Sequence, residues 1–188
     1  MQIEHTKQAL AQALLDLMST KPIEQITVQE LATACHIRRQ SFYYHFADVY
    51  ALVDWILTQA KASFSDSWED FLSWQSYLTA LLTHLDAQRS QYQPVVNALG
   101  FGYLYRMFQG DVQLFLRKLI LHYAPTPPSE QELGFLVYYY NKVVASFLDS
   151  FLRQELPYSN RELIAHLDAL VSDHARGAML RYLGDTLD

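Results

Sequence analysis

Hydrophobic residues recur three and four positions apart along most of the chain, a spacing typical of amphipathic helices. The first stripe lies within residues 6–20, and Lys21-Pro22 marks its end, because proline lacks the amide hydrogen that a continuing helix needs. A second, shorter stripe follows Thr27. Thr27 and Glu30 form a capping-box pattern, in which the hydroxyl accepts from an orphan amide and the carboxylate reaches back. The stripe is therefore predicted to be a short helix.

Two more helices are predicted close behind it. Cys35-His36-Ile37 forms a tight connection, and a third helix opens at Arg38. Asp48 is a candidate N-cap for a fourth helix, whose apolar face carries Val49, Leu52, Val53 and Ile56. A short helix, a tight turn and a further helix make a helix-turn-helix layout. Residues 1–47 are predicted to form this unit.

The remainder, residues 48–188, keeps helical stripes and shows no strand-like alternation beyond residue 64. Helices are predicted over 74–89 and 90–98, with a break at Gly100 and Gly102. A further stripe covers 112–120, until APTPPS stops the helix. The prediction is an all-α chain, with an N-terminal three-helix unit and a larger helical body.

Two long helices are predicted at the end of the body. Ser129 with Glu132 and Ser159 with Glu162 repeat the capping-box pattern at their starts, and Pro157 separates them. Their long apolar stripes favour an interface with another molecule or packing inside the body. The residues concerned include Tyr140, Val144, Phe147, Phe151, Leu167, Leu170, Val171 and Ala178.

Composition narrows the function classes. The net charge is −6, so any attraction to nucleic acid must come from a local patch. Cys35 is the single cysteine and cannot form an internal disulfide. The N-terminus lacks a signal-peptide layout and no apolar run is long enough to cross a membrane, so a cytoplasmic location is expected. No catalytic motif occurs, and we expect neither enzyme activity nor a cofactor.

The histidines of the body give no sign of a metal site. They lack the spacing to carboxylate or thiol partners that metal ligands show, and are expected to be surface or hydrogen-bonded core residues. They are His84, His122, His166 and His174.

The segment HIRRQSFYYHF, residues 36–46, places cationic and aromatic side chains together. At 100° per residue Phe42 and Phe46 face one side of a helix, whereas Gln40 and Tyr44 face the other. Arginine can bind guanine through two hydrogen bonds, glutamine can bind adenine, and hydroxyl groups can bind phosphate. The alternative is an ordinary helical hairpin with a solvated polar face. The near absence of acidic residues on this face, and its position after a capped short helix, favour a DNA-reading surface.

The stretch TVQELATACHIRRQSFYYHFADVYALVDWI resembles the TetR family of bacterial transcription regulators. The family shows a capped second helix, a turn, and a recognition helix that ends in an aromatic-Tyr-x-His-Phe run. By this resemblance the operator DNA would be contacted by Thr27, Arg38, Arg39, Gln40, Ser41, Tyr43, Tyr44 and His45. Two positions depart from the family pattern. His36 stands where the turn usually has glycine, and Val49 stands where a phosphate-binding lysine is common.

The segments IRRQSFYYHF and YLTALLTHLDAQRSQY also resemble a narrower group, the activators of dihydroxyacetone-kinase operons in Gram-positive bacteria. In that group the regulator works with a kinase-like co-activator protein that senses the ligand. This resemblance implies a protein partner for the body rather than a small molecule.

The family resemblance implies a homodimer and an effector pocket. The two last helices would pair with those of a second copy, which would place two recognition helices in successive major grooves. The body is rich in aromatic residues, which either line a pocket for an apolar or planar effector or pack in the core. These aromatic residues are Trp55, Trp68, Trp74, Tyr103, Tyr105, Phe108, Tyr138 and Tyr139.

Two hypotheses from different classes follow from the sequence. The first is a dimeric, sequence-specific DNA-binding transcription regulator without a membrane association. The rival is a helical protein-interaction module with a degenerate DNA reader, which the acidic charge, His36 and Val49 motivate.

Overall fold

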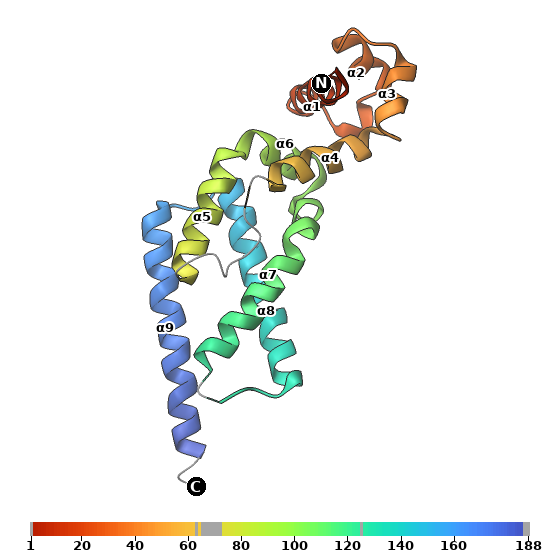
Figure 1. The fold of residues 1–188 in the computed structure, drawn as a ribbon. Coiled ribbons are helices and arrows are strands. Elements are labelled where there is room, and N and C mark those ends of the chain that lie inside the picture. Colours follow the sequence, from red (N-terminus) through yellow and green to blue (C-terminus); the bar gives the residue numbers. More distant parts are fainter. Residues whose placement is uncertain (1, 63, 65–72, 125, 186–188) are drawn as a thin grey trace. The chain divides into compact units, whose positions relative to one another are not determined.

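The computed structural model describes residues 2–62, 64, 73–124 and 126–185, and these residues form helices without any strand (Figure 1). The predicted all-α fold is confirmed. The helices are α1 (Gln2–Met18), the 3-10 helix η1 (Ile23–Gln25), α2 (Val28–Ala34), α3 (Arg39–His45), α4 (Val49–Ala62), α5 (Trp74–Ala87), α6 (Arg89–Leu99), α7 (Phe101–Tyr123), α8 (Glu130–Leu152) and α9 (Asn160–Asp185).

The chain divides into two compact units. The first contains residues up to Phe64 together with Leu85–Met107, and the second contains the described parts of 65–84 and 108–188. In the first unit, α1 lies against α2, α4 and α6, and α2 lies against α3. Its fully buried side chains include Leu10, Leu14, Leu31, Phe42 and Tyr92. The first unit is larger than the predicted domain of residues 1–47, since it also takes in α4 and α6. The boundary of a DNA-binding domain between residues 47 and 48 stays a prediction.

Three capping boxes open α2, α8 and α9. The side chain of Ser129 accepts from the amide of Glu132 at 3.3 Å, and the Glu132 carboxylate accepts from the Ser129 amide at 2.8 Å. Ser159 and Glu162 repeat these bonds at 3.3 and 2.9 Å. Each box satisfies amides that a helix N-terminus leaves without a partner. All three boxes predicted from the Ser/Thr-x-x-Glu spacing are present.

The break ahead of α7 lies at Gly100 and not at Gly102. Gly100 adopts φ +79°, a left-handed conformation that suits glycine, whereas Gly102 is inside α7. The stripe predicted over 112–120 therefore belongs to a helix that begins earlier, at Phe101. The 3-10 turn at Ile23–Gln25 was not predicted from the sequence.

The second unit contains α8, α9 and most of α5 and α7. The rings of Tyr77 and Phe115 stack with centroids 4.8 Å apart and join α5 to α7. Gln75 donates to Asp168 at 2.7 Å and so links α5 to α9. Among the described helices, none is both long enough and apolar enough to cross a membrane.

The carboxylate of Glu30 is the shared acceptor at the start of α2. It accepts from the amide and hydroxyl of Thr27 at 2.9 Å each and from Lys21 Nζ at 2.5 Å. The hydrogen bond from Lys21 is the largest cause that lowers the pKa of Glu30 from 4.5 to about 2, followed by the bonds from Thr27. Favourable bonds to the charged form keep the carboxyl ionised.

We expect Lys21→Met to raise the titration midpoint of Glu30 from about 2 toward 4.5. A carboxyl with a lowered pKa stabilises the folded chain above its unfolded pKa, and that contribution is lost as the pH falls to the folded pKa. The variant should therefore lose less stability than the wild type between pH 4.5 and 2. Carboxyl-carbon NMR across this range measures the titration midpoint of Glu30 in the wild type and in the variant. Glu132 is the matched control, because its capping box contains no lysine, and an equal shift there would contradict the assignment.

Candidate nucleic-acid interface

The turn between α2 and α3 is closed by two backbone hydrogen bonds. The amide of Ile37 donates to the carbonyl of Ala32 at 2.9 Å, and the amide of His36 donates to that of Thr33 at 3.1 Å. This pairing is a Schellman motif, which needs a left-handed residue just after the helix. His36 supplies it with φ 54°. The turn expected to favour glycine is thus formed by histidine in the conformation that glycine would adopt.

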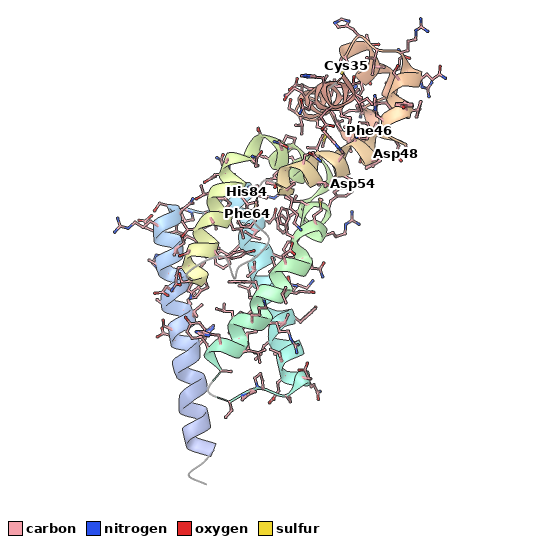
Figure 2. All side chains as sticks on the ribbon, in the orientation of Figure 1. Cys35, Phe46, Asp48, Asp54, Phe64 and His84 are labelled. Carbon is pink, nitrogen blue, oxygen red and sulfur yellow. The ribbon has the colours of Figure 1, made fainter. Side chains whose placement is uncertain are left out.

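Two phenylalanines hold α3 to the first unit. Phe42 is fully buried and Phe46 is buried, with ring centroids 5.9 Å apart. The ring of Phe46 also lies 5.9 Å from that of Trp55 in α4, and Lys7 Nζ of α1 lies 5.7 Å from the Trp55 ring. Figure 2 shows Phe46 and Asp48 between α3 and α4. The inward face predicted for α3 is confirmed.

The N-cap Arg38 and the remaining side chains of α3 lie on the outward side of the helix. Arg38, Arg39 and Gln40 are exposed, and Tyr44 is 79% exposed. Tyr43 is 47% exposed, whereas Ser41 and His45 are half-buried. These seven residues, the reading face, contain no carboxylate. They form the candidate nucleic-acid interface, and their contacts with DNA stay a prediction.

Arg39 is held by a neighbour on the reading face. Its Nη2 donates to the hydroxyl of Tyr43 at 3.1 Å, and its guanidinium carbon lies 5.6 Å from the centre of the Tyr43 ring. Residues four positions apart on a helix are neighbours, so the Arg-x-x-x-Tyr spacing was a signal for this contact. The sequence analysis did not use it.

Both hydrogen-bond donors of Thr27 are occupied within the capping box. Both its amide and its hydroxyl donate to Glu30, so neither hydrogen is available to a phosphate unless the capping box opens. At the start of α4, the Asp48 carboxylate accepts from the Ala51 amide at 2.8 Å, which confirms the predicted cap. Val49 is buried, and the next residue, Tyr50, is exposed. The candidate contacts with DNA therefore concentrate on α3.

A cavity of about 1220 Å³ lies within the second unit. It is bounded by α5, α7, α8 and α9, with apolar side chains over most of its wall. Trp74 lies in this wall and is only 7% exposed. Its buried indole N–H has no hydrogen-bond partner among the described residues. Tyr140 of α8 and His174 of α9 also line the cavity, with Tyr140 Oη 2.8 Å from His174 Nδ1.

The predicted pocket residues divide between the two units. Trp74 and Tyr139 line the cavity. Phe108 is buried in the second unit, and Tyr138 is exposed there under Lys142, whose Nζ lies 5.4 Å from its ring. Trp68 lies outside the described residues. The other three, Trp55, Tyr103 and Tyr105, belong to the first unit.

The residues predicted for a dimer interface line the same cavity. They are Tyr140, Val144, Phe147, Phe151, Leu167, Leu170 and Val171. The side chain of Ala178 lies outside the described residues. The apolar faces of α8 and α9 thus line the cavity of the second unit. Part of this cavity is open to solvent, because Tyr139 and Leu170 are exposed.

Within the part of the chain that the structure describes, there is no indication of a metal centre. Among the residues that it describes, no three His, Cys, Asp or Glu side chains come together to hold a metal ion. His84 is buried, and burial lowers its pKa, which favours the neutral ring. Burial likewise raises the pKa of the Cys35 thiol, which disfavours the reactive thiolate.

The chain is similar to a curated sequence and to a solved structure that are both named as the operon activator DhaS. It is 33% identical over 90 residues, 48% of either chain, to the HTH-type dhaKLM operon transcriptional activator DhaS of Lactococcus lactis subsp. lactis (strain IL1403). The chain thus matches about half the length of that curated relative. A solved structure named dihydroxyacetone kinase operon activator DhaS matches 91% of this chain and 96% of its own, with a TM-score of 0.61 and 24% identity.

These similarities establish the fold. The chain has the all-helical fold of the solved activator across most of its length. Both relatives are named as regulators and not as enzymes, which supports the prediction that this chain is not an enzyme. No protein-family description matches the sequence.

His36→Gly should raise the free energy of unfolding by about 0.5–1 kcal/mol, measured by urea denaturation. The left-handed conformation costs a side-chain-bearing residue roughly 1–2 kcal/mol, whereas glycine costs roughly 0.5–1 kcal/mol in unfolded-state entropy. Ala34→Gly is the matched control, because Ala34 is an exposed residue in the last turn of α2. It should destabilise the chain by about 0.5–1 kcal/mol. Equal losses for the two variants would contradict a strained turn.

Proposed function

We propose that the chain is a sequence-specific, DNA-binding transcription regulator of the TetR type. The observation that carries the proposal is the reading face of α3, which presents two arginines and no carboxylate on a chain of net charge −6. Its backbone is fixed by the Schellman turn and by the buried Phe42. The likeness to a sequence and a solved structure named as the operon activator DhaS supports regulation of transcription, and favours activation over repression. Such a regulator would act in the cytoplasm.

A homodimer is part of the proposal. One α3 of 7 residues reaches few base pairs, and a two-fold pair would double the contacts and place two copies in successive major grooves. Exposed apolar side chains on α8 and α9 support an interface with a second copy. They include Phe135, Tyr138, Tyr139 and Leu170.

We further propose that the second unit controls DNA binding by taking up a small, apolar ligand in its cavity. The apolar wall favours such a molecule, and the buried indole N–H of Trp74 favours a ligand with a hydrogen-bond acceptor. The alternative is control by a kinase-like co-activator protein, which the resemblance to the dihydroxyacetone-kinase operon activators implies. In that case the exposed aromatic residues of α8 would be its contact surface.

The wild type should protect two half-sites about 10 base pairs apart in footprinting of DNA upstream of its own operon.

Arg38→Ala should weaken binding to all sequences. It should lower the slope of log affinity against log salt concentration by about 1, because a phosphate contact releases one counterion. Arg161→Ala is the control, because this exposed cation at the start of α9 is assigned neither to DNA nor to the interface, and it should leave the slope unchanged. Binding without sequence preference would instead favour the interaction module with a degenerate reader.

The cavity can be probed with two naphthalenes of nearly equal shape. We expect 2-acetylnaphthalene to bind about two- to tenfold more tightly than 2-isopropenylnaphthalene, because only the ketone accepts a hydrogen bond from Trp74. Trp74→Phe keeps the aromatic wall and should abolish the preference. Fluorescence titration measures the four affinities. Failure of both compounds to bind, or an unchanged preference in the variant, would contradict ligand control through this cavity.

A further inference from the structure

The two adjacent arginines of the reading face differ in how they are held. The Arg39 guanidinium bonds to the Tyr43 hydroxyl at 3.1 Å and lies over the Tyr43 ring at 5.6 Å. The Arg38 side chain is exposed and makes no hydrogen bond, ion pair or ring contact with any residue that the structure describes. The Arg39 guanidinium therefore has a preferred position in the absence of DNA, whereas the Arg38 guanidinium does not.

The Tyr43 ring is itself held by a contact with the core of the first unit. Its ring meets the ring of Phe42 edge to face, with centroids 5.7 Å apart and planes at 86°. Phe42 is fully buried in the core of the first unit. A continuous series of contacts thus runs from the core through Phe42 and Tyr43 to Arg39. The neighbouring Tyr44 is more exposed and its ring contacts His45 instead.

The contact leaves both side chains able to bind a partner. A guanidinium has five N–H donors, and the bond to Tyr43 occupies one of them. The remaining donors can still form the paired bonds to O6 and N7 of guanine. Because Tyr43 accepts in this bond, its own hydroxyl hydrogen also stays available. Holding a long side chain near its bound position reduces the rotamer entropy that binding removes.

We propose that Tyr43 is a positioning residue that holds Arg39 to read a guanine, while the unheld Arg38 contacts phosphate. Base readout requires one geometry at one base, which favours the held arginine. A phosphate can be approached from many directions, which suits a side chain without a fixed position. This inference rests on the proposed DNA binding and deepens it, because it assigns different roles to the two arginines.

The holding of Arg39 can be tested without DNA. Nitrogen relaxation of the arginine Nε groups should give a higher order parameter for Arg39 than for Arg38 in the wild type. The value for Arg39 should fall in Tyr43→Phe, which keeps the ring and removes the hydroxyl. It should fall to the level of Arg38 in Tyr43→Leu. Equal mobility of the two arginines in the wild type would overturn the proposal.

The reading role is tested by measuring affinity for a library of operator variants. Arg39→Ala should abolish the preference for guanine at one position in each half-site, whereas Arg38→Ala should leave that preference intact. Tyr43→Phe should reduce it about two- to tenfold, as expected for the loss of one hydrogen bond. Tyr43→Leu should reduce it by a further factor of about two to five through loss of the cation–ring contact. Tyr44→Phe is the matched control, and should weaken all sequences equally.

A double-mutant cycle separates positioning from direct contact. If Tyr43 acts through Arg39, Tyr43→Phe will not change base preference further in an Arg39→Ala background. If Tyr43→Phe weakens all sequences equally and additively with Arg39→Ala, Tyr43 only contacts phosphate and the proposal is wrong. Absence of selective DNA binding by the wild type would overturn the proposed function. The relaxation measurement would then still decide whether Tyr43 holds Arg39.

Discussion

The burial of Phe42 determines which side chains α3 can offer to a partner. Removing a buried phenylalanine side chain costs roughly 3–5 kcal/mol, whereas a hydrogen bond such as that between Arg39 and Tyr43 contributes about 1 kcal/mol. The core therefore sets the rotation of α3, and surface contacts only adjust what it presents. With Phe42 inward, Gln40 and Tyr44 must point outward. The Schellman turn at His36 then fixes where α3 begins relative to α2.

Charge works against DNA binding at long range and for it at short range. A net charge of −6 repels a polyanion, so attraction must arise where the reading face comes close. The candidate contact outside the reading face is weakened, because Thr27 donates to Glu30, and the buried Val49 stands where the TetR pattern often has a phosphate-binding lysine. Few of the candidate contacts thus remain outside the reading face to bind phosphate. Binding by a single copy would be weak and salt-sensitive, which makes pairing of two copies more important for the proposed function.

Local rules in the sequence predicted helix starts in both units and the inward face of α3. The Ser/Thr-x-x-Glu spacing located three helix starts, and the 100° rotation separated Phe42 and Phe46 from the outward residues. Both rules need only neighbours within one or two turns. The extent of α7 was missed because Gly102 looks like a helix breaker, although an exposed helix tolerates a single glycine at a cost of about 1 kcal/mol.

Tertiary packing decided what the sequence could not predict. A helical stripe shows which side is apolar but not what covers it, so Val144 and Leu167 fitted an interface and a core equally well. In the structure they line a cavity together with Trp74, which is about 70 residues or more away in sequence. The same limit applies to the aromatic residues. Trp55 and Tyr103 were grouped with Trp74 by residue type, but packing assigns them to the first unit.

Helix α7 runs from the first unit into the second, and this matters for the control of DNA binding. The second-unit part of α7 contributes Val112 and Leu116 to the cavity wall. Its first-unit part carries Tyr103, whose hydroxyl donates to Asp54 of α4 at 2.8 Å; burial first, and then this bond, raises the pKa of Tyr103 to about 12. Lys61 of α4 also donates to the carbonyl of Met107 at 3.1 Å. A ligand can shift an equilibrium only by its differential affinity for two states. Control through the cavity would therefore need two states that differ in a helix shared by the two units, and α7, with its bonds to α4 within the first unit, is one such helix.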